Sequence, residues 1–310
     1  MSQSPSPKLP KGIEVFERGW LSANNIFIWG DGNTSLVDTG YVSQDKLTLS
    51  LVQHALQKHQ LPTLTKIVNT HLHSDHCGGN QLLHKTFNCP ISIPIAESAA
   101  VKHWNENLLS FKATGQDCPA FKYEHLLEPG QTIRLGSYDW DILAAPGHAP
   151  HAIMLYQASN RLLISADALW EEGFGVVFPE LTGESGFEEV AQTIDLIETL
   201  DVDLVIPGHG KPFNDVKKAI DTARSRLDYL STNISRNARH AAKVLLKFKL
   251  LEWQTKDIHL VNTWMLETPL FTAIAIQLDM TLDELITWLP PALCEAGGAR
   301  IDQAQLINID

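Results

Sequence analysis

Several features that place a protein in a special class are missing from this sequence. Its 310 residues contain four widely scattered cysteines and no CxxC pair, so a chain of this length needs no disulfide framework. It has no run of about 18 apolar residues that could span a bilayer. Residues 1–11 are rich in serine and proline and lack an apolar stretch, which predicts a flexible arm rather than a signal peptide. The sequence therefore predicts a cytoplasmic protein without a membrane partner.

Basic residues are also scarce. Lysine and arginine number 24 against 36 aspartates and glutamates, giving a formal charge of −12 at pH 7. Because phosphate binding depends on lysine and arginine, this balance argues against nucleic acid as a general partner. The stretch 211–249 is the exception, with ten basic and three acidic residues. A solvated helix face is its ordinary interpretation, and a nucleic-acid patch is the alternative.

The residues that are present indicate an ordinary globular α/β protein, with 44% hydrophobic and 19% charged residues. Between residues 12 and 212, short β-like runs alternate with helical stretches. Strands are predicted at 13–17, 26–29, 35–37, 66–69, 91–94, 133–135, 139–144, 153–157, 162–165 and 203–206. Helices are predicted from Ser43 as N-cap through residue 56, and at 81–87, 96–112 and 187–200. The irregular stretch that follows residue 112 and reaches residue 127 is predicted to be a lid.

The character of the sequence changes after residue 212. The pattern is almost wholly helical over 214–253, with a break near 231–233, and further helices are predicted at 257–266, 270–278 and 282–288. Pro290 and Pro291 should end the last of these helices. Residues 299–301 and 305–307 could form a small hairpin. We therefore expect an arm at 1–11, a catalytic domain at 12–212 and a helical C-terminal region at 213–310.

The segment THLHSDHCGG, at residues 70–79, carries the strongest chemical signal. Four ligand-type side chains occur within six positions, just after a predicted strand: His71, His73, Asp75 and His76. Imidazole and carboxylate groups suit Zn²⁺, and also Mn²⁺ or Fe²⁺. Two glycines then allow the backbone to turn tightly into the next helix. A histidine-rich surface loop is the alternative interpretation.

Three later positions complete the set. His148 follows Ala-Pro-Gly, Asp167 follows Ser-Ala, and His209 follows Ile-Pro-Gly, each at the end of a predicted strand. Sites in α/β proteins are built at such strand ends. A single Gly-His pair carries little information, but the three positions in this order behind HxHxDH form a specific pattern.

This set of motifs resembles the metallo-β-lactamase superfamily over about residues 12–212. The resemblance implies a four-layer αββα sandwich with a mainly helical C-terminal extension and a metal cleft at one edge of the two sheets. It also implies two divalent ions, with zinc expected and manganese or iron as alternatives. The first ion would be held by His71, His73 and His148, the second by Asp75, His76 and His209, with Asp167 bridging both. Asp38 matches an aspartate that orients a ligand imidazole, and a turn-forming aspartate is the alternative.

The chemistry implied by such a site is hydrolysis. Two cations ~3.5–4 Å apart can trap a bridging water and lower its pKa toward ~7. The resulting hydroxide attacks an ester, thioester or lactone carbonyl, so neither serine nor cysteine is needed as nucleophile. Asp75 is the expected catalytic residue, because it is placed to orient the hydroxide and to accept its proton.

Residues after the bridging aspartate bear on the substrate. In this superfamily Asp167 argues against a β-lactamase and suits thioesterases of the glyoxalase II type, lactonases and phosphodiesterases. Trp170 stands where the best-known acyl-homoserine lactonases carry tyrosine. Trp170, Phe174 and Phe178 are expected to form a pocket wall for a partly apolar substrate, with ordinary loop packing as the alternative. His151, three residues after His148, could face the site or the surface.

The sequence therefore predicts a dinuclear hydrolase that acts on a small-molecule ester, thioester or lactone. The alternatives are a β-lactamase and a phosphodiesterase or ribonuclease of the same superfamily, the latter supported only by the charge of 211–249. A non-enzymatic scaffold would not need the complete ligand set. The tail from about residue 212 should cover the mouth of the site or form a homodimer contact.

Overall fold

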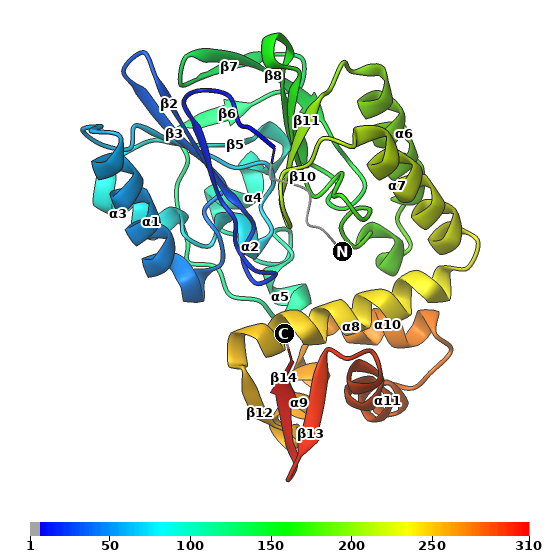
Figure 1. Cartoon of the computed structure of the whole chain (residues 1–310). Coiled ribbons are helices and arrows are strands. Elements are labelled where there is room, and N and C mark those ends of the chain that lie inside the picture. Colours follow the sequence, from blue (N-terminus) through cyan, green and yellow to red (C-terminus); the bar gives the residue numbers. More distant parts are fainter. Residues whose placement is uncertain (1–6, 310) are drawn as a thin grey trace.

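The computed structural model describes residues 7–309, and these form two β-sheets packed face to face, with helices outside and a helical tail (Figure 1). The first six residues of the predicted arm lie outside the described residues. Of the remainder, Leu9 packs against the core between the sheets, and the hydroxyl of Tyr138 donates a hydrogen bond of 2.8 Å to the carbonyl of Lys11. Among the described residues, no helix is both long and apolar enough to cross a membrane.

The first sheet has six strands in sequential order. They are β1 (Ile13–Phe16), β2 (Asn25–Gly30), β3 (Asn33–Val37), β4 (Lys66–Val68), β5 (Ile91–Pro94) and β6 (His125–Leu127). The pairs β1–β2 and β2–β3 are antiparallel, and the sheet continues as parallel pairs from β3 to β6. Strand β6 lies within the stretch predicted to be a lid. That part of the prediction was wrong, because Leu127 is buried in the core between the sheets.

The second sheet has five strands, in the order β11 (Leu204–Pro207), β10 (Leu162–Ala166), β9 (Ile153–Gln157), β8 (Tyr138–Ala144) and β7 (Thr132–Leu135). Only β10 and β11 pair in parallel. Strands β9, β10 and β11 are buried along their whole length, which explains their nearly continuous apolar sequences. Apolar side chains of both sheets, such as Ile28, Val68, Trp140 and Ile164, form one core between them.

Two pairs of helices cover the outer faces of the sheets (Figure 1). Helices α1 (Asp45–Lys58) and α3 (Asn80–Phe87) share a core with the first sheet, and α6 (Phe187–Thr199) and α7 (Val216–Ser231) share one with the second. The predicted αββα sandwich is confirmed. Ser43 is not the N-cap of α1, because a short turn at Val42–Gln44 precedes a helix that starts at Asp45.

The tail has its own core beneath the sandwich. It contains α8 (Ile234–Trp253), α9 (Ile258–Glu267), α10 (Pro269–Gln277), α11 (Leu282–Glu295) and a sheet of β12 (Thr255–Asp257), β14 (Gln305–Asn308) and β13 (Ala299–Asp302). Helix α8 runs along the boundary between the sandwich and the rest of the tail (Figure 1). The predicted hairpin is present, but β12 adds a third strand that the sequence pattern did not reveal.

Two of the predicted helices end at different places in the structure. Helix α11 continues through Pro290 and Pro291, although prolines were expected to stop it. Leu289 and Leu293 on either side are buried in the tail core, so packing outweighs the loss of backbone hydrogen bonds there. The helix predicted at 96–112 is shorter, because α4 (Ser98–His103) ends at Trp104, whose backbone is left-handed. After α4 the chain is irregular apart from the single turn α5 (Phe111–Thr114).

Candidate metal centre

Four of the candidate side chains are supplied by one short stretch after β4. His71 lies in the loop that leaves this strand, and His73 is the N-cap residue of the one-turn helix α2 (Ser74–Cys77). Asp75 and His76 belong to that turn and are buried with it. The loop after β4 therefore lies at the edge of the first sheet, and the turn of α2 brings Asp75 and His76 close to one another there.

The other three side chains come from the second sheet. His148 follows β8, Asp167 follows β10 and His209 follows β11, and these three strands run in the same direction. Their carboxyl ends therefore meet at one edge of the sheet. Gly208 is required for this approach, because a Cβ atom there would lie 2.1 Å from Oδ1 of Asp167. The two sheets face each other at this edge, so all seven predicted side chains converge.

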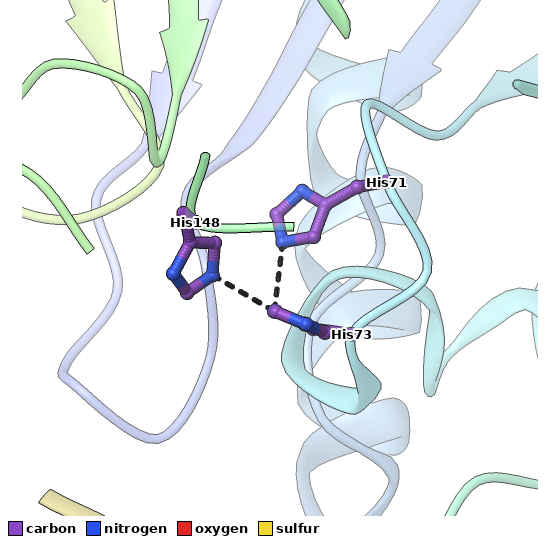
Figure 2. A group of neighbouring side chains, drawn as sticks. All are labelled: His71, His73 and His148. Carbon is purple, nitrogen blue, oxygen red and sulfur yellow. Dashed lines mark hydrogen bonds between the residues drawn. The ribbon is translucent and has the colours of Figure 1, made fainter. Parts of the chain in front are cut away.

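Three histidines form the first group. Nδ1 of His73 lies 3.2 Å from Nε2 of His71 and 2.8 Å from Nε2 of His148. Figure 2 shows the rings of His71 and His148 directed at His73 from two sides. One nitrogen of each ring lies within 4.8 Å of the others, a spacing that a single metal ion could bridge.

A second group lies beside the first. Asp75, His76 and His209 offer ligand atoms within 4.8 Å of one another, with Oδ2 of Asp75 placed 3.0 Å from Nε2 of His209. Asp167 lies between the two groups. Its Oδ2 atom is 3.3 Å from Nε2 of His148 and 3.5 Å from Nε2 of His76. One carboxylate is therefore close to both groups.

Hydrogen bonds behind the rings orient two of the histidines. Nδ1 of His76 donates to Oδ2 of Asp38 at 2.8 Å, and Nδ1 of His148 donates to the carbonyl of Val176 at 2.6 Å. Since these acceptors carry no proton, the proton of each ring must sit on Nδ1. Nε2 of both rings then faces the centre. Nε2 of His76 is buried and has no hydrogen-bond partner among the described residues. This nitrogen could therefore coordinate a metal ion.

Burial and neighbouring charges determine the protonation of the cluster. Burial lowers the pKa of His71, His73 and His148, that of His73 to about 3, so these imidazoles are neutral at pH 7. Burial is the largest single influence on Asp75 and Asp167 and raises their pKa, but the combined effects of His76 and His209 outweigh it. In turn, burial lowers the pKa of His76, but Asp167, Asp38 and Asp75 together raise it above its usual value. The net pKa of both carboxyl groups is lowered, so both are ionised. Neutral imidazoles with ionised carboxylates are the donor set of a divalent cation.

A cavity of about 300 Å³ opens onto this cluster. Trp170, Val176 and Phe178 line one side, whereas His240, Val244, Leu245 and Phe248 of α8, together with Arg226 of α7, line another. The ring of Trp20 stacks on His209 with a centroid separation of 5.4 Å and an angle of 11°. The cavity therefore combines a polar floor with walls that are mostly apolar.

Of the further residues predicted to lie near the site, some line the cavity and others do not. Trp170 and Phe178 line the cavity, and Asp38 contacts His76. Phe174 is buried behind the wall, below Arg226, and does not contact the cavity. His151 is exposed and does not line the cavity, because its side chain turns to the surface near Glu97. The possible pocket role of Phe174 and His151 is thus not borne out by their positions.

Several residues of the cavity wall were missed by the sequence analysis. Trp20 and Arg226 belong to no motif, and only the fold brings them to the site. His240, Val244 and Phe248 are spaced four residues apart and so share one face of α8. That spacing could have identified a common face, although nothing in the sequence says what the face meets.

Comparisons with known proteins agree with this arrangement. A probable metallo-hydrolase of Methanocaldococcus jannaschii is 28% identical over 194 residues, covering 61% of this chain and 88% of that protein. An acyl-coenzyme A thioesterase of Gallus gallus is 26% identical over 236 residues, covering 66% and 80% respectively. The crystal structure of a metallo-beta-lactamase family protein from Thermus thermophilus has a TM-score of 0.59 at 17% identity, covering 97% of this chain and 100% of that one.

The family itself follows from a broader match. The sequence model of the Metallo-beta-lactamase superfamily matches residues 18–209, which is more than half of the chain. All seven clustered histidines and aspartates fall inside the matched region, at the sheet edge where the fold brings them together. The chain therefore belongs to the metallo-beta-lactamase superfamily.

Proposed function

We propose that this protein is a dinuclear metal-dependent hydrolase that acts on an ester, thioester or lactone. The observation that carries the proposal is the convergence of seven histidine and aspartate side chains, all buried except the partly buried His73, on the floor of a largely apolar cavity. His71, His73 and His148 would hold one ion, and Asp75, His76 and His209 the other, with Asp167 shared between them. We propose zinc as the metal, with manganese or iron as alternatives.

The donor set fits divalent cations. Nδ1 of His73 lies within 3.2 Å of a nitrogen of each of its two neighbouring imidazoles, and buried nitrogens of His76 and His209 have no hydrogen-bond partner among the described residues. Divalent ions held there would polarise a substrate carbonyl and lower the pKa of water so that it can attack. Seven ligands exceed the three protein ligands of a mononuclear catalytic zinc site, which supports two ions.

The side chains of the chain itself contribute orientation and proton transfer. The carboxylate of Asp75 lines the cavity and is held by His209, so it can orient the attacking water and accept its proton. Trp20, Trp170 and Phe178 surround the same space and limit the access of bulk water. Limited water access strengthens the electrostatic interactions of the reacting groups.

The alternatives receive less support. Three of the ten basic residues in the 211–249 stretch pair with carboxylates of the described part of the chain: Lys217 with Asp221, Arg224 with Asp195 and Glu198, and Lys249 with Asp117 and Glu252. The formal charge of −12 is a further argument against a nucleic-acid substrate. The similarity to an acyl-coenzyme A thioesterase, whose length is 80% covered, favours thioesters among the carbonyl substrates.

The test combines metal analysis with a substrate panel. Elemental analysis of protein purified without added metal should give about two metal ions per chain, and chelation should abolish activity. Values of kcat/KM are then measured for acyl thioesters, aryl esters, lactones, β-lactams and phosphodiesters. If a β-lactam or phosphodiester were preferred by more than about tenfold, or ~1.4 kcal/mol of transition-state stabilisation, the carbonyl-ester proposal would be refuted.

A further inference from the structure

A single arginine lines the cavity of the metal centre. Arg226 of α7 packs its Cδ against Gly173, where a Cβ atom would come within 2.7 Å. Its guanidinium carbon lies 5.5 Å from the centroid of the Phe174 ring, and Nη2 donates a hydrogen bond of 2.8 Å to Nε2 of His240. Three neighbouring residues therefore fix the position of this side chain.

The charge of Arg226 is not neutralised within the protein. Among the described residues, no carboxylate oxygen lies within 4.0 Å of its guanidinium, whereas Arg224 on the same helix contacts two carboxylates. Nε of Arg226 is buried without a hydrogen-bond partner in the described part of the chain. A part-buried cation beside apolar walls has lost much of its hydration, and an anion that supplies the missing interaction would be bound strongly.

His240 does not compensate for this charge. Because arginine can only donate, Nε2 of His240 must be the acceptor, so the ring is neutral when the two are hydrogen-bonded. Burial, together with Arg226 and Lys243, lowers the pKa of His240 to about 4, which keeps it neutral at pH 7. His240 thus acts as a support that orients the guanidinium and leaves its remaining N–H groups for another partner.

The cavity has one other charged residue on its wall away from the metal centre. Glu172 lines the same space but is exposed to solvent, where its charge is screened. Most of the other residues that line the cavity away from the metal centre are apolar, such as Trp170 and Val244. A molecule that contacts both Arg226 and the metal centre would therefore present a negative group to Arg226, an electrophilic carbonyl to the metal centre, and an apolar body to the walls.

We propose that Arg226 is the anion-recognition residue of this cavity, and that the substrate carries a carboxylate or phosphate group separated from its scissile carbonyl by an apolar segment. Both anions match the planar fork of an arginine, which can donate two parallel hydrogen bonds. This inference rests on the proposed hydrolase function. It makes Arg226 the binding partner of the substrate end that lies away from the reacting carbonyl.

The test uses three matched acyl thioesters that differ only at the far end, which is a carboxylate, a phosphate or a neutral amide. They are assayed with the metal-loaded wild-type enzyme and with Arg226→Met, Arg226→Lys and Lys218→Met. Lys218→Met is the control, because it removes one exposed positive charge from the same helix. Melting temperature is recorded for every variant, and Arg226→Lys preserves the charge if Arg226→Met is poorly folded.

We expect the wild-type enzyme to prefer one of the charged thioesters over the amide by about tenfold or more in kcat/KM, the effect of one charge-assisted hydrogen bond. Arg226→Met should lower kcat/KM, mainly through KM, for the preferred charged thioester by about tenfold more than for the amide, and Arg226→Lys should keep part of the preference. The better of the two charged substrates identifies the anion. The inference is overturned if the wild-type enzyme shows no preference, or if Arg226→Met impairs charged and neutral substrates equally.

A binding measurement separates this inference from the proposed function. Naphthalene-2-sulfonate, an anion with an apolar body, and its neutral methyl sulfone analogue are titrated into the metal-loaded protein. The sulfonate should bind more tightly than the sulfone to the wild type and to Lys218→Met, and this difference should disappear in Arg226→Met. If no thioester, ester or lactone is hydrolysed, the proposed function fails, while equal binding of the two probes to the wild type contradicts the role of Arg226.

Discussion

Nδ1 of His76 donates a hydrogen bond of 2.8 Å to Oδ2 of Asp38, and the same carboxylate accepts from both the backbone N–H and the hydroxyl of Thr70. Asp38 follows β3 and Thr70 follows β4, so neighbouring strands of the first sheet hold the carboxylate from two directions. The ring of His76 is thereby fixed with Nε2 toward the centre. Of the two interpretations of Asp38, the geometry favours a positioning residue for a ligand histidine over a turn-forming residue.

The first prediction concerns Asp38. Replacing it with Asn removes the charge that orients His76 while keeping the side-chain volume, so metal affinity should fall by about 10–100-fold. Competition with a chromophoric chelator measures this affinity. Asp31→Asn is the control, because Asp31 is exposed and pairs with Arg134 away from the centre. Unchanged metal affinity in Asp38→Asn would show that Asp38 does not support the site.

The second prediction separates metal binding from catalysis. His73→Ala removes a nitrogen at the middle of the first group, so metal content and activity should be lost together. Asp75→Asn should reduce kcat more than metal content, because the carboxylate also orients water and accepts its proton. Metal analysis and kinetics on the same preparations provide the comparison. A variant Asp75→Asn with full kcat would remove the catalytic role assigned to this residue.

The third prediction is a pH dependence of stability that arises from His240. Its pKa is about 4 in the folded protein, because of burial and the nearby Arg226 and Lys243, against about 6.5 in an unfolded chain. The unfolded chain therefore binds a proton that the folded chain does not, and stability falls as pH drops from about 6.5 to about 4. Over that window the wild type should lose up to ~3 kcal/mol more than His240→Gln.

Denaturant unfolding at several pH values measures this difference. Both proteins keep the same metal-centre side chains, so changes in metal binding with pH cancel between them. The unfolding free energy of the wild type minus that of His240→Gln should be greater near neutral pH than at pH 4. Parallel pH profiles for the two proteins would contradict the buried, neutral state of His240.

The fourth prediction tests the packing of the tail. Leu246 of α8 is fully buried in the tail core and does not line the cavity, so Leu246→Ala should cost about 2–5 kcal/mol of unfolding free energy. Leu266→Ala, at a site that is 53% exposed, should change stability by less than about 0.5 kcal/mol. Equal effects of the two substitutions, measured by chemical denaturation, would show that α8 is not packed as described.

The sequence was sufficient to predict that the candidate ligands cluster, but it did not predict the cavity. Each candidate ligand follows a strand, and strands that run together end at one edge, so the convergence of His148, Asp167 and His209 could be predicted from order alone. The contact of Arg226 with His240 could not be predicted. It depends on how α7, which packs on the second sheet, meets α8 of the tail, and this arrangement leaves no local pattern in the sequence.

Other errors have similar causes. Strand β6 was taken for part of a lid because three residues with two exposed side chains give too short a pattern. Local propensity predicts that a helix ends at Pro290, but the flanking leucines are buried in the tail core and α11 continues through it. In both cases a tertiary contact outweighed the local signal.

Helix α8 has a consequence for how such proteins diversify. It supplies one wall of the cavity, yet it lies wholly beyond residues 18–209, which carry every histidine and aspartate of the metal centre. One wall of the cavity is thus encoded outside the region that carries the candidate metal ligands, whereas Trp20, Trp170 and Phe178 of the opposite side lie inside it. Substitutions at His240, Val244 or Phe248 can retune what enters the cavity while the reactive groups stay unchanged. Sequence similarity that is confined to the first two thirds of the chain therefore carries no information about the cavity wall formed by α8.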